Sequence, residues 1–403
     1  MSDLLLSFVD ARKAVEQHAA TPSPPGEEQV NLCAAHGRVL ASPITADRDL
    51  PPFNRSTRDG FAVRSADVRE APVTLQRVGE VRAGTAWPRK IAPGETVEIM
   101  TGAPVPEGAD AVAMVEHTNA VGTQVEVVRT VQAGENVAPR GSEALGGSVL
   151  VAAGTVVDEA VVGVAASVGA VELTAFRRPR VAILATGDEL VRPDEVPGPT
   201  QIRNANSAML AALVQKAGAE AVILPVAPDK LEPTRALVQQ GLDADLLLLA
   251  GGVSAGKYDL VEDVLDEYGA EFIFTGALIQ PGKPIVFGRV GNKYFFGLPG
   301  NPVSVFVTFT LFVRPLLEAL CGAVPSPLRF VRAALRCPIN VKAGLTRFLP
   351  AHVSIECNEL RVEQITWQGS GDLVALARSN CFIVVRSDRE HLAAGEQVEV
   401  LLR

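Results

Sequence analysis

Apolar strands alternate with amphipathic helices between residues 181 and 298, and this alternation limits the fold more than any other feature of the sequence. The strand-like runs are VAILAT (181–186), AEAVILPVA (219–227) and ADLLLLAGG (244–252); the helix-like runs between and after them are NSAMLAALVQKAG (206–218), PTRALVQQGL (233–242) and LVEDVLDEYG (260–269). Strands that are apolar on both faces and alternate with helices indicate a parallel sheet covered on both sides. We therefore predict a parallel-sheet α/β domain over residues 177–325.

The rest of the chain has a different sequence pattern. A chain of 403 residues exceeds what one hydrophobic core usually serves, so about three or four domains are expected. Residues 51–140 hold short valine-rich runs separated by Gly and Pro turns, which predicts a β domain. Residues 326–403 return to short strands, which suggests a small C-terminal β-barrel. A helix is expected over 4–19, a short one around VNLCAAHGRVL (30–40), and another in EAVVGVAASVGA (159–170).

Composition excludes several classes of protein. The formal net charge of -9 argues against a nucleic-acid partner, which favours a basic surface. The five cysteines stand singly, without a C-x-x-C pair, as expected for free thiols in a reducing compartment. The five histidines have no zinc-ligand spacing. No apolar run reaches the ~20 residues of a membrane span. We expect a cytoplasmic protein without a membrane partner.

Ligands of open parallel sheets bind at the carboxyl ends of the strands. One loop there, GGVSAGKYD (251–259), combines glycines that let the backbone approach an anion with a hydroxyl donor and a following helix N-terminus. It resembles a nucleotide phosphate loop, but Tyr258 stands where such a loop has Ser or Thr. A tight turn without a ligand is the alternative. The candidate anion contacts are Gly251, Gly252, Ser254 and Gly256.

Three carboxylates, Glu189, Asp229 and Asp259, follow strands of the same sheet. Each one alone also suits a helix or loop cap. Together they are costly unless a cation neutralises them, because like charges raise one another's pKa. Mg²⁺, which prefers oxygen ligands and shares phosphate oxygens, fits such a site. We therefore predict a Mg²⁺ site on these three residues.

Two further turns of the α/β domain, QPGKP and GLPGNPVS, carry candidate ligand contacts. Lys283 suits a point-charge contact with phosphate, or is a solvated loop lysine. The prolines stiffen the turn that begins the next helix. In the β domain, the segments RSTRDGFAV (55–63) and IMTGAPVPEGADAV (99–112) each contain a turn. Considered singly, each of these turns is best explained by a structural role. The candidate residues of the two α/β turns are Gly282, Lys283, Pro299, Asn301 and Pro302.

Six segments, in this order, resemble the motifs of the molybdopterin molybdotransferase family, the MoeA proteins and the gephyrin E domain: STRDGFAV, TGAPVPEGADAV, TGDEL, GGVSAGKYD, PGKP and GLPGNPVS. The resemblance implies an elongated four-domain dimer: domain I from 1–50 and 141–176, domain II from 51–140, domain III from 177–325 and domain IV from 326–403. It also implies insertion of molybdate into adenylylated molybdopterin with Mg²⁺-dependent release of AMP. A separate molybdopterin adenylyltransferase is then expected, because the chain has a single α/β domain of this kind. The positions that match family sites are Asp59, Thr101, Glu189, Asp229, Asp259, Pro299, Pro302 and Ser370.

The chain departs from the family mainly at basic positions. Gln280 and Gly276 stand where members often carry Lys or Arg, and Leu345 and Pro350 replace two arginines, with Arg347 nearby. Glu143 replaces a common aspartate and keeps the charge. Fewer cations weaken an anion site. Altered affinity for substrate or molybdate is one interpretation; a scaffold or cofactor carrier on the same fold, or a hydrolase of another pyrophosphate compound, are the alternatives.

Overall fold

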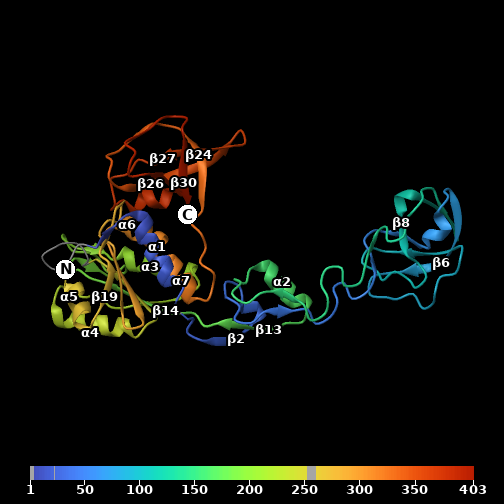
Figure 1. The fold of residues 1–403 in the computed structure, drawn as a ribbon, viewed down its shortest axis with the longest axis horizontal. Coiled ribbons are helices and arrows are strands. Elements are labelled where there is room, and N and C mark those ends of the chain that lie inside the picture. The colour runs from blue at the N-terminus through green and yellow to red at the C-terminus, as the bar shows by residue number, and fades with distance from the viewer. Residues whose placement is uncertain (1–3, 22, 252–259) are drawn as a thin grey trace.

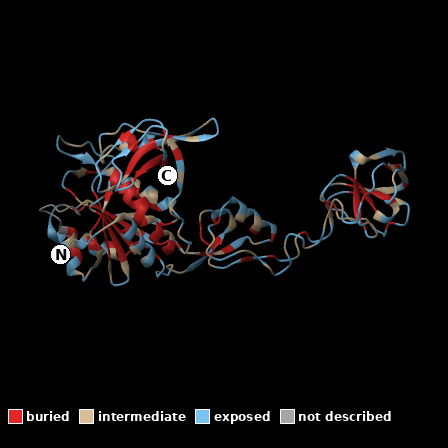
Figure 2. Cartoon of the chain, turned by 45° about the horizontal axis from the view of Figure 1, so that its top comes forward, coloured by how far each residue is buried: buried red, intermediate tan, exposed pale blue. Residues whose placement is uncertain are grey.

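The computed structural model describes residues 4–21, 23–251 and 260–403. The chain is elongated, with the α/β domain and the C-terminal barrel at one end, domain II at the other, and a small β-rich unit between them (Figure 1). Buried residues gather at the two ends and in a smaller core of the middle unit, whereas the segments that connect these parts are largely exposed (Figure 2). We keep the four domain names; their boundaries stay a prediction.

Domain III contains a six-stranded sheet in the order β17-β14-β18-β23-β22-β19. Alternate residues of β18 enter different cores: Leu246 and Leu248 pack with α3 and α6, whereas Leu247 and Leu249 pack with α4 and α5. Both faces are therefore covered, as the apolar strands predicted. The elements are β14 (Arg180–Ala185), β15 (Leu190–Val191), β16 (Ile202–Arg203), α3 (Ala205–Lys216), β17 (Glu220–Ile223), α4 (Leu231–Leu242), β18 (Leu246–Ala250), α5 (Leu260–Glu267), β19 (Glu271–Phe274), β20 (Gly276–Ala277), β21 (Ile279–Gln280), β22 (Val286–Val290) and β23 (Lys293–Leu298).

The sheet is not parallel throughout. The four strands β17, β14, β18 and β23 are parallel, but β22 and β19 run antiparallel at one edge. A tight turn joins β22 directly to β23, and Gly291 in that turn has a φ of 58°. A hairpin this short leaves no room for a crossover helix, so its strands must be antiparallel.

One long helix, Pro302–Leu320, crosses behind the sheet as α6 (Pro302–Thr308), a π-helical turn η4 (Phe309–Val313) and α7 (Arg314–Leu320). By length and composition alone this helix of 19 residues could cross a membrane. In the structure, however, 89% of its most apolar window is buried inside the protein. It is a core helix of the α/β domain.

The beginning of the chain packs onto domain III. Strand β1 (Leu5–Leu6) pairs with β20, and Ser7 caps α1 (Phe8–Ala19) by accepting a hydrogen bond from the Asp10 N–H. Phe8 meets the rings of Phe312 and Phe348 edge-on, with centroids 6.3 and 5.4 Å away. The helix expected over 4–19 is thus present from residue 8.

The small unit in the middle of the molecule is built from two separated stretches of sequence. Strand β13 pairs antiparallel with β2, and β12 pairs with β3. The helix expected near residues 30–40 is wrong: β2 runs through Asn31, and only one 3-10 turn follows, because pairing with β13 satisfies the backbone here. The elements are β2 (Glu27–Asn31), η1 (Leu32–Ala34), β3 (Ile44–Thr45), β12 (Val149–Val151), α2 (Glu159–Ser167) and β13 (Glu172–Phe176).

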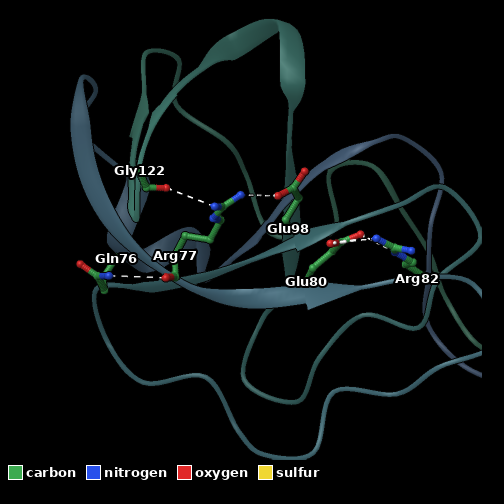
Figure 3. Close-up of polar contacts among 6 residues, drawn as sticks. All are labelled: Gln76, Arg77, Glu80, Arg82, Glu98 and Gly122. Carbon is green, nitrogen blue, oxygen red and sulfur yellow. Dashed lines mark hydrogen bonds and ion pairs between the residues drawn. The ribbon is translucent and has the colours of Figure 1, made fainter.

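Domain II is a six-stranded sheet in the order β8-β5-β7-β6-β10-β9, with an apolar core on each face. Its strands do not simply meander, because β6 and β7 run parallel. Figure 3 shows Arg77 of β6 donating hydrogen bonds to Glu98 of β7 at 2.6 Å and to the Gly122 carbonyl at 3.2 Å. The elements are β4 (Arg55–Ser56), β5 (Gly60–Val63), η2 (Ser65–Val68), β6 (Val73–Val81), β7 (Glu95–Ile99), β8 (Ala111–Met114), η3 (Val115–His117), β9 (Thr118–Val121), β10 (Gln124–Val127) and β11 (Val137–Ala138).

Domain IV is a closed barrel, as the sequence predicted. Strands β26, β27, β24, β30 and β28 pair in turn, and β28 pairs back with β26. Strand β21 of the α/β domain adds to β26 in parallel and ties the two domains together. The elements are β24 (Phe330–Leu335), β25 (Ile339–Asn340), β26 (Thr346–Glu356), β27 (Glu359–Gln364), α8 (Leu373–Arg378), β28 (Cys381–Val385), β29 (His391–Leu392) and β30 (Gln397–Leu402).

Candidate active site

A cleft of about 530 Å³ opens at the carboxyl ends of β14, β18 and β23, where an α/β sheet is expected to bind its ligand. Its walls include Thr186 and Glu189 after β14, Gly251 after β18, and the turn after β23. Of the residues predicted from sequence, the cleft brings together Glu189, Gly251, Pro299, Asn301 and Pro302.

Two helices begin at this cleft. Asn204 caps α3 through its side-chain oxygen, which accepts a hydrogen bond from the Ser207 N–H at 3.1 Å, and α6 begins at Pro302. Free N–H groups and the partial positive charge at helix N-termini favour anions. Among the residues described at the cleft, Arg203 is the single cation and Glu189 the single carboxylate. An anion in this cleft would therefore meet helix ends and loop N–H groups more than basic side chains.

Arg203, Asn204 and Asn206 line the cleft and were missed by the sequence analysis. The Asn206 amide donates to the Gly300 carbonyl at 2.6 Å, whereas its side-chain oxygen is buried without a hydrogen-bond partner in the described structure. Buried acceptors normally find a donor. The run IRNANS, which opens a helix with a capping Asn after a strand end, was the signal available in the sequence.

A second pocket of about 320 Å³ adjoins the first and shares Pro284, Pro299 and Asn301 with it. It lies between domains III and IV and contains Gly282, Lys283 and Ser370, three of the predicted residues. Lys283 is exposed and makes no ion pair with any residue that the structure describes. Its charge is therefore available to a ligand.

Ser370 of domain IV makes two hydrogen bonds to the beginning of α6. Its hydroxyl accepts a hydrogen bond from the Asn301 amide at 2.9 Å, and its carbonyl accepts one from the Val303 N–H at 3.0 Å. Ser370 thus satisfies a free N–H group at the beginning of the helix. The two domains share this corner of the site.

At two predicted positions the backbone conformation favours glycine over every other residue. Gly251 has a φ of 92°, and a side chain there would come 3.1 Å from the Thr186 carbonyl oxygen. Gly282 has a φ of 112°, and a Cβ would meet the Thr308 methyl at 2.5 Å. Both conformations are unfavourable for residues with a side chain. At Gly282 the close approach to Thr308 also leaves no room for a side chain unless Thr308 shifts.

The predicted metal ligands lie on neighbouring loops. Glu189 lines the cleft, and Asp229 follows β17, whose loop lies beside that of β14 through the Thr186–Ala227 bridge. Asp188 rather than Glu189 contacts Asp229, accepting its N–H at 3.3 Å. Within residues 4–21, 23–251 and 260–403, no three His, Cys, Asp or Glu side chains gather closely enough to hold a metal ion.

Several predicted residues fall outside the described part of the chain. Gly252, Ser254, Gly256 and Asp259 all lie between residues 252 and 259. Their assignments as anion contacts and, for Asp259, as a metal ligand stay predictions.

Asp59 and Thr101 are not brought to the cleft. Both lie on domain II, at the far end of the molecule from the α/β domain (Figure 1). The Thr101 N–H and hydroxyl both donate to the Asp59 carboxylate, which lowers the Asp59 pKa below its usual value. Within one chain, the domain II residues and the cleft residues form separate sites.

The departures from the family pattern fall at different places. Gln280 and Leu345 line the second pocket, where a cation would face a ligand. A Cβ at Gly276 would lie 2.8 Å from a methyl of Leu5, so the packing of β1 leaves little space for a side chain. Pro350 is buried in β26, and the Arg347 guanidinium donates to the Lys342 carbonyl. Glu143 accepts a hydrogen bond from Arg55 at 2.6 Å.

A doubly covered α/β domain with a cleft at the carboxyl ends of its parallel strands, where two helices begin, defines the class of this protein. Residues 6–169 match the MoeA N-terminal region (domain I and II), residues 182–319 a probable molybdopterin binding domain, and residues 332–402 the MoeA C-terminal region (domain IV). This chain belongs to the MoeA family, as its motifs indicated.

Similar proteins cover nearly the whole chain. The molybdopterin molybdenumtransferase of Staphylococcus aureus (strain MSSA476) is 31% identical over 97% of this chain and 94% of its own. That of Bacillus subtilis (strain 168) is 34% identical over 91% and 87%. The crystal structure of the molybdopterin biosynthesis moeA protein from Pyrococcus horikoshii OT3 superposes with a TM-score of 0.83 and 31% identity, covering 99% of this chain and all of that one.

Proposed function

We propose that this protein is a molybdopterin molybdenumtransferase, which inserts molybdate into adenylylated molybdopterin and releases AMP at the last step of molybdenum cofactor synthesis. The observation that carries the proposal is the cleft at the carboxyl edge of the sheet, where α3, α6 and the Gly251 turn meet beside Glu189. Such an arrangement favours a pyrophosphate. Relatives of the same length are named for this activity.

The residues of the cleft have complementary tasks in this reaction. The N-termini of α3 and α6 stabilise the negative charge of the pyrophosphate, and Lys283 adds a point charge from the second pocket. The turn that carries Lys283 depends on Gly282, whose φ of 112° is unfavourable for other residue types.

The described donors are of the chemical kind that Mg²⁺ prefers. Glu189 offers a carboxylate in the cleft and Asp229 another on the adjacent loop, and Mg²⁺ commonly takes one or two protein carboxylates together with substrate phosphates and water. Bound there, Mg²⁺ would supply Lewis-acid neutralisation of the phosphate oxygens. Asp259 is the third proposed ligand.

A homodimer would explain why two predicted residues lie far from the cleft. Asp59 and Thr101 belong to a domain that stands at the far end of an elongated chain. In a two-fold dimer, domain II of one chain can lean over the cleft of its partner, which makes two equal sites. We propose that each active site combines the cleft of one chain with Asp59 and Thr101 of the other.

The direct test incubates the purified protein with adenylylated molybdopterin, Mg²⁺ and molybdate and measures AMP by chromatography. Release of AMP that requires all three components supports the transferase. Tight binding of the adenylate without AMP release would instead support a non-catalytic carrier or scaffold, which the uncharged Gln280 and Leu345 favour. A cytoplasmic location and a separate adenylyltransferase that supplies the substrate complete the proposal.

A further inference from the structure

A cavity of about 250 Å³ lies away from the active site, between the α/β domain and the barrel. It is bounded by the C-terminal end of α3, by the helix 302–320, by the segment that leads into the barrel, and by the last residues of β30. The active-site cleft lies at the other end of α3, and the two share no lining residue. We call this space the interdomain cavity.

The interdomain cavity is strongly cationic, although the chain carries a net charge of -9. Among the described residues that line it, Glu318 is the single carboxylate. The cations are Lys216, Arg314, Arg329 and Arg403. Lys216 alone could be explained by its position in the last turn of α3, where a cation complements the helix dipole. Arg403 also lies at a helix end, because it donates to the Leu376 and Ser379 carbonyls in and after the last turn of α8. Arg314 and Arg329 have no such explanation.

Arg314 is only a quarter exposed, and its charge is poorly compensated. Its nearest carboxylate oxygen, on Glu318, is 3.6 Å from Nε. Nε and Nη2 are both buried without a hydrogen-bond partner in the described structure. Burial lowers the Arg314 pKa, and the neighbouring Arg12 and Arg329 lower it further, against the opposing effect of Glu318. A buried guanidinium in this state is costly unless an anion pairs with it.

Neither Glu318 nor the contacts of Arg403 neutralise the excess positive charge of the cavity. The other oxygen of Glu318 accepts the Ser326 N–H at 2.5 Å, so the carboxylate is shared. Arg403 donates to the carbonyls of Leu376 and Ser379, both at 2.6 Å, and stacks over the Phe306 ring at 4.5 Å. These neutral partners hold its guanidinium in place without cancelling its charge.

The size and walls of the cavity limit the ligand. Its volume is below the roughly 300–1,000 Å³ of sites for drug-sized molecules. Phe306 and Phe309 form an apolar wall, which strengthens charge interactions by excluding water. A small, doubly charged oxyanion fits both the volume and the surplus of positive charge.

We propose that the interdomain cavity binds a tetrahedral oxyanion of the phosphate, sulfate or molybdate type between Arg314 and Arg329. The anion pairs with a guanidinium that lacks a full partner on α7 and with a second one on the segment before β24. It thereby links the α/β domain to the barrel. This site is separate from the proposed catalytic cleft and does not depend on the transferase activity.

The test is calorimetric titration and thermal unfolding of the full chain with phosphate, sulfate or molybdate, with chloride added to hold the ionic strength constant. We expect Arg314→Gln and Arg329→Gln each to weaken binding at least about tenfold and to remove most of the anion-dependent rise in Tm. Arg69→Gln, which removes an exposed charge on domain II, is the matched control and should bind like wild type.

Further variants separate anion binding in the interdomain cavity from binding elsewhere and from misfolding. Lys283→Ala removes the cation of the second pocket and Arg203→Gln removes that of the cleft, so anion binding that survives both substitutions does not belong to the catalytic site. Arg329 is exposed and makes no ion pair within the described residues, so Arg329→Gln is expected to fold even if Arg314→Gln does not. Selective binding of one of the three anions supports the site and identifies its ligand, and equal binding of all three supports a general oxyanion site. Equal anion binding by wild type and Arg329→Gln would overturn it.

Discussion

The Asp59 carboxylate accepts two hydrogen bonds from Thr101, at 2.6 Å from its N–H and at 2.8 Å from its hydroxyl. The backbone donor is the larger cause of the lowered Asp59 pKa, and the hydroxyl is the second. Since both residues are exposed at the surface of domain II, this pair presents a fixed negative charge away from its own core. A partner surface or ligand in the second protomer would meet that charge.

We predict that Thr101→Val raises the Asp59 pKa part of the way toward its ordinary value, because the hydroxyl is lost and the backbone N–H remains. A lowered pKa in the folded state adds stability above the ordinary carboxyl pKa, and this contribution disappears as the pH falls through the folded value. The stability difference between wild type and variant should therefore be largest near neutral pH and vanish in acid. NMR titration of the Asp59 carboxyl and urea unfolding at each pH measure both effects.

The control is Thr118→Val, whose hydroxyl donates to the Val115 carbonyl rather than to a carboxylate. Its stability loss should not vary with pH. An unchanged Asp59 titration in Thr101→Val would contradict the assigned hydrogen bond.

Mixed dimers test whether the site is shared. Asp59→Asn and Lys283→Ala are each expected to be inactive. After random subunit exchange in equal amounts, half the dimers are mixed, and one of the two clefts in each is intact, so roughly a quarter of wild-type AMP release should return. If both residues acted within one chain, exchange verified by mass spectrometry would restore no activity.

Glu189→Gln is expected to lower AMP release at least about tenfold while binding of the adenylate changes less, because the carboxylate serves the metal more than the substrate. Asp188→Asn is the matched control: it removes a charge from the same loop but keeps an oxygen for the Asp229 N–H. Normal turnover of Glu189→Gln at limiting Mg²⁺ would rule out its assignment as a metal ligand.

Gln280→Lys should tighten anion binding at the second pocket and steepen its dependence on salt, since it adds one cation beside Lys283. Titration of molybdate and of the adenylate at low and high ionic strength measures the change. An unchanged affinity at low salt would mean that a side chain at 280 does not reach the ligand.

Gly282→Ala is expected to destabilise the protein more than Gly147→Ala. Both glycines have positive φ, of 112° and 82°, so each substitution costs roughly 1 kcal/mol or more in the backbone. Only Gly282 also has a close neighbour, the Thr308 methyl, whereas nothing lies within 4 Å of a Cβ at Gly147. Chemical denaturation should separate the two variants, and equal losses would show that the turn relaxes without cost.

Much of this architecture could be predicted from sequence, because local sequence patterns determine the strands, turns and helix starts. Apolar runs such as that of β18 identify buried strands, and the turn prolines mark the beginning of α6 at Pro302. The antiparallel edge of the sheet could not be predicted in the same way. A strand buried on both faces has the same composition whichever way it runs, and only the short Gly291 turn decides its direction.

The candidate site was predicted less completely than the fold. Charged residues at strand ends, such as Glu189, stand out in a sequence. Asn206 does not, because its importance comes from a contact with the Gly300 carbonyl on a distant turn and from an acceptor left without a partner. The pairing of Ser370 with Asn301 likewise depends on how the barrel docks onto the α/β domain, which no local pattern encodes.

The N-terminal helix has a consequence for how the protein is made. Residues Phe8–Ala19 leave the ribosome long before the helix 302–320, yet Ala11 and Val15 are buried against a core that this helix completes. Contacts so far apart in sequence close slowly. Domain II, continuous over 51–140, can fold during synthesis, whereas the α/β domain must wait for its last helix. Until then the apolar face of the first helix is uncovered, and nascent chains are exposed to aggregation and to chaperones for most of translation.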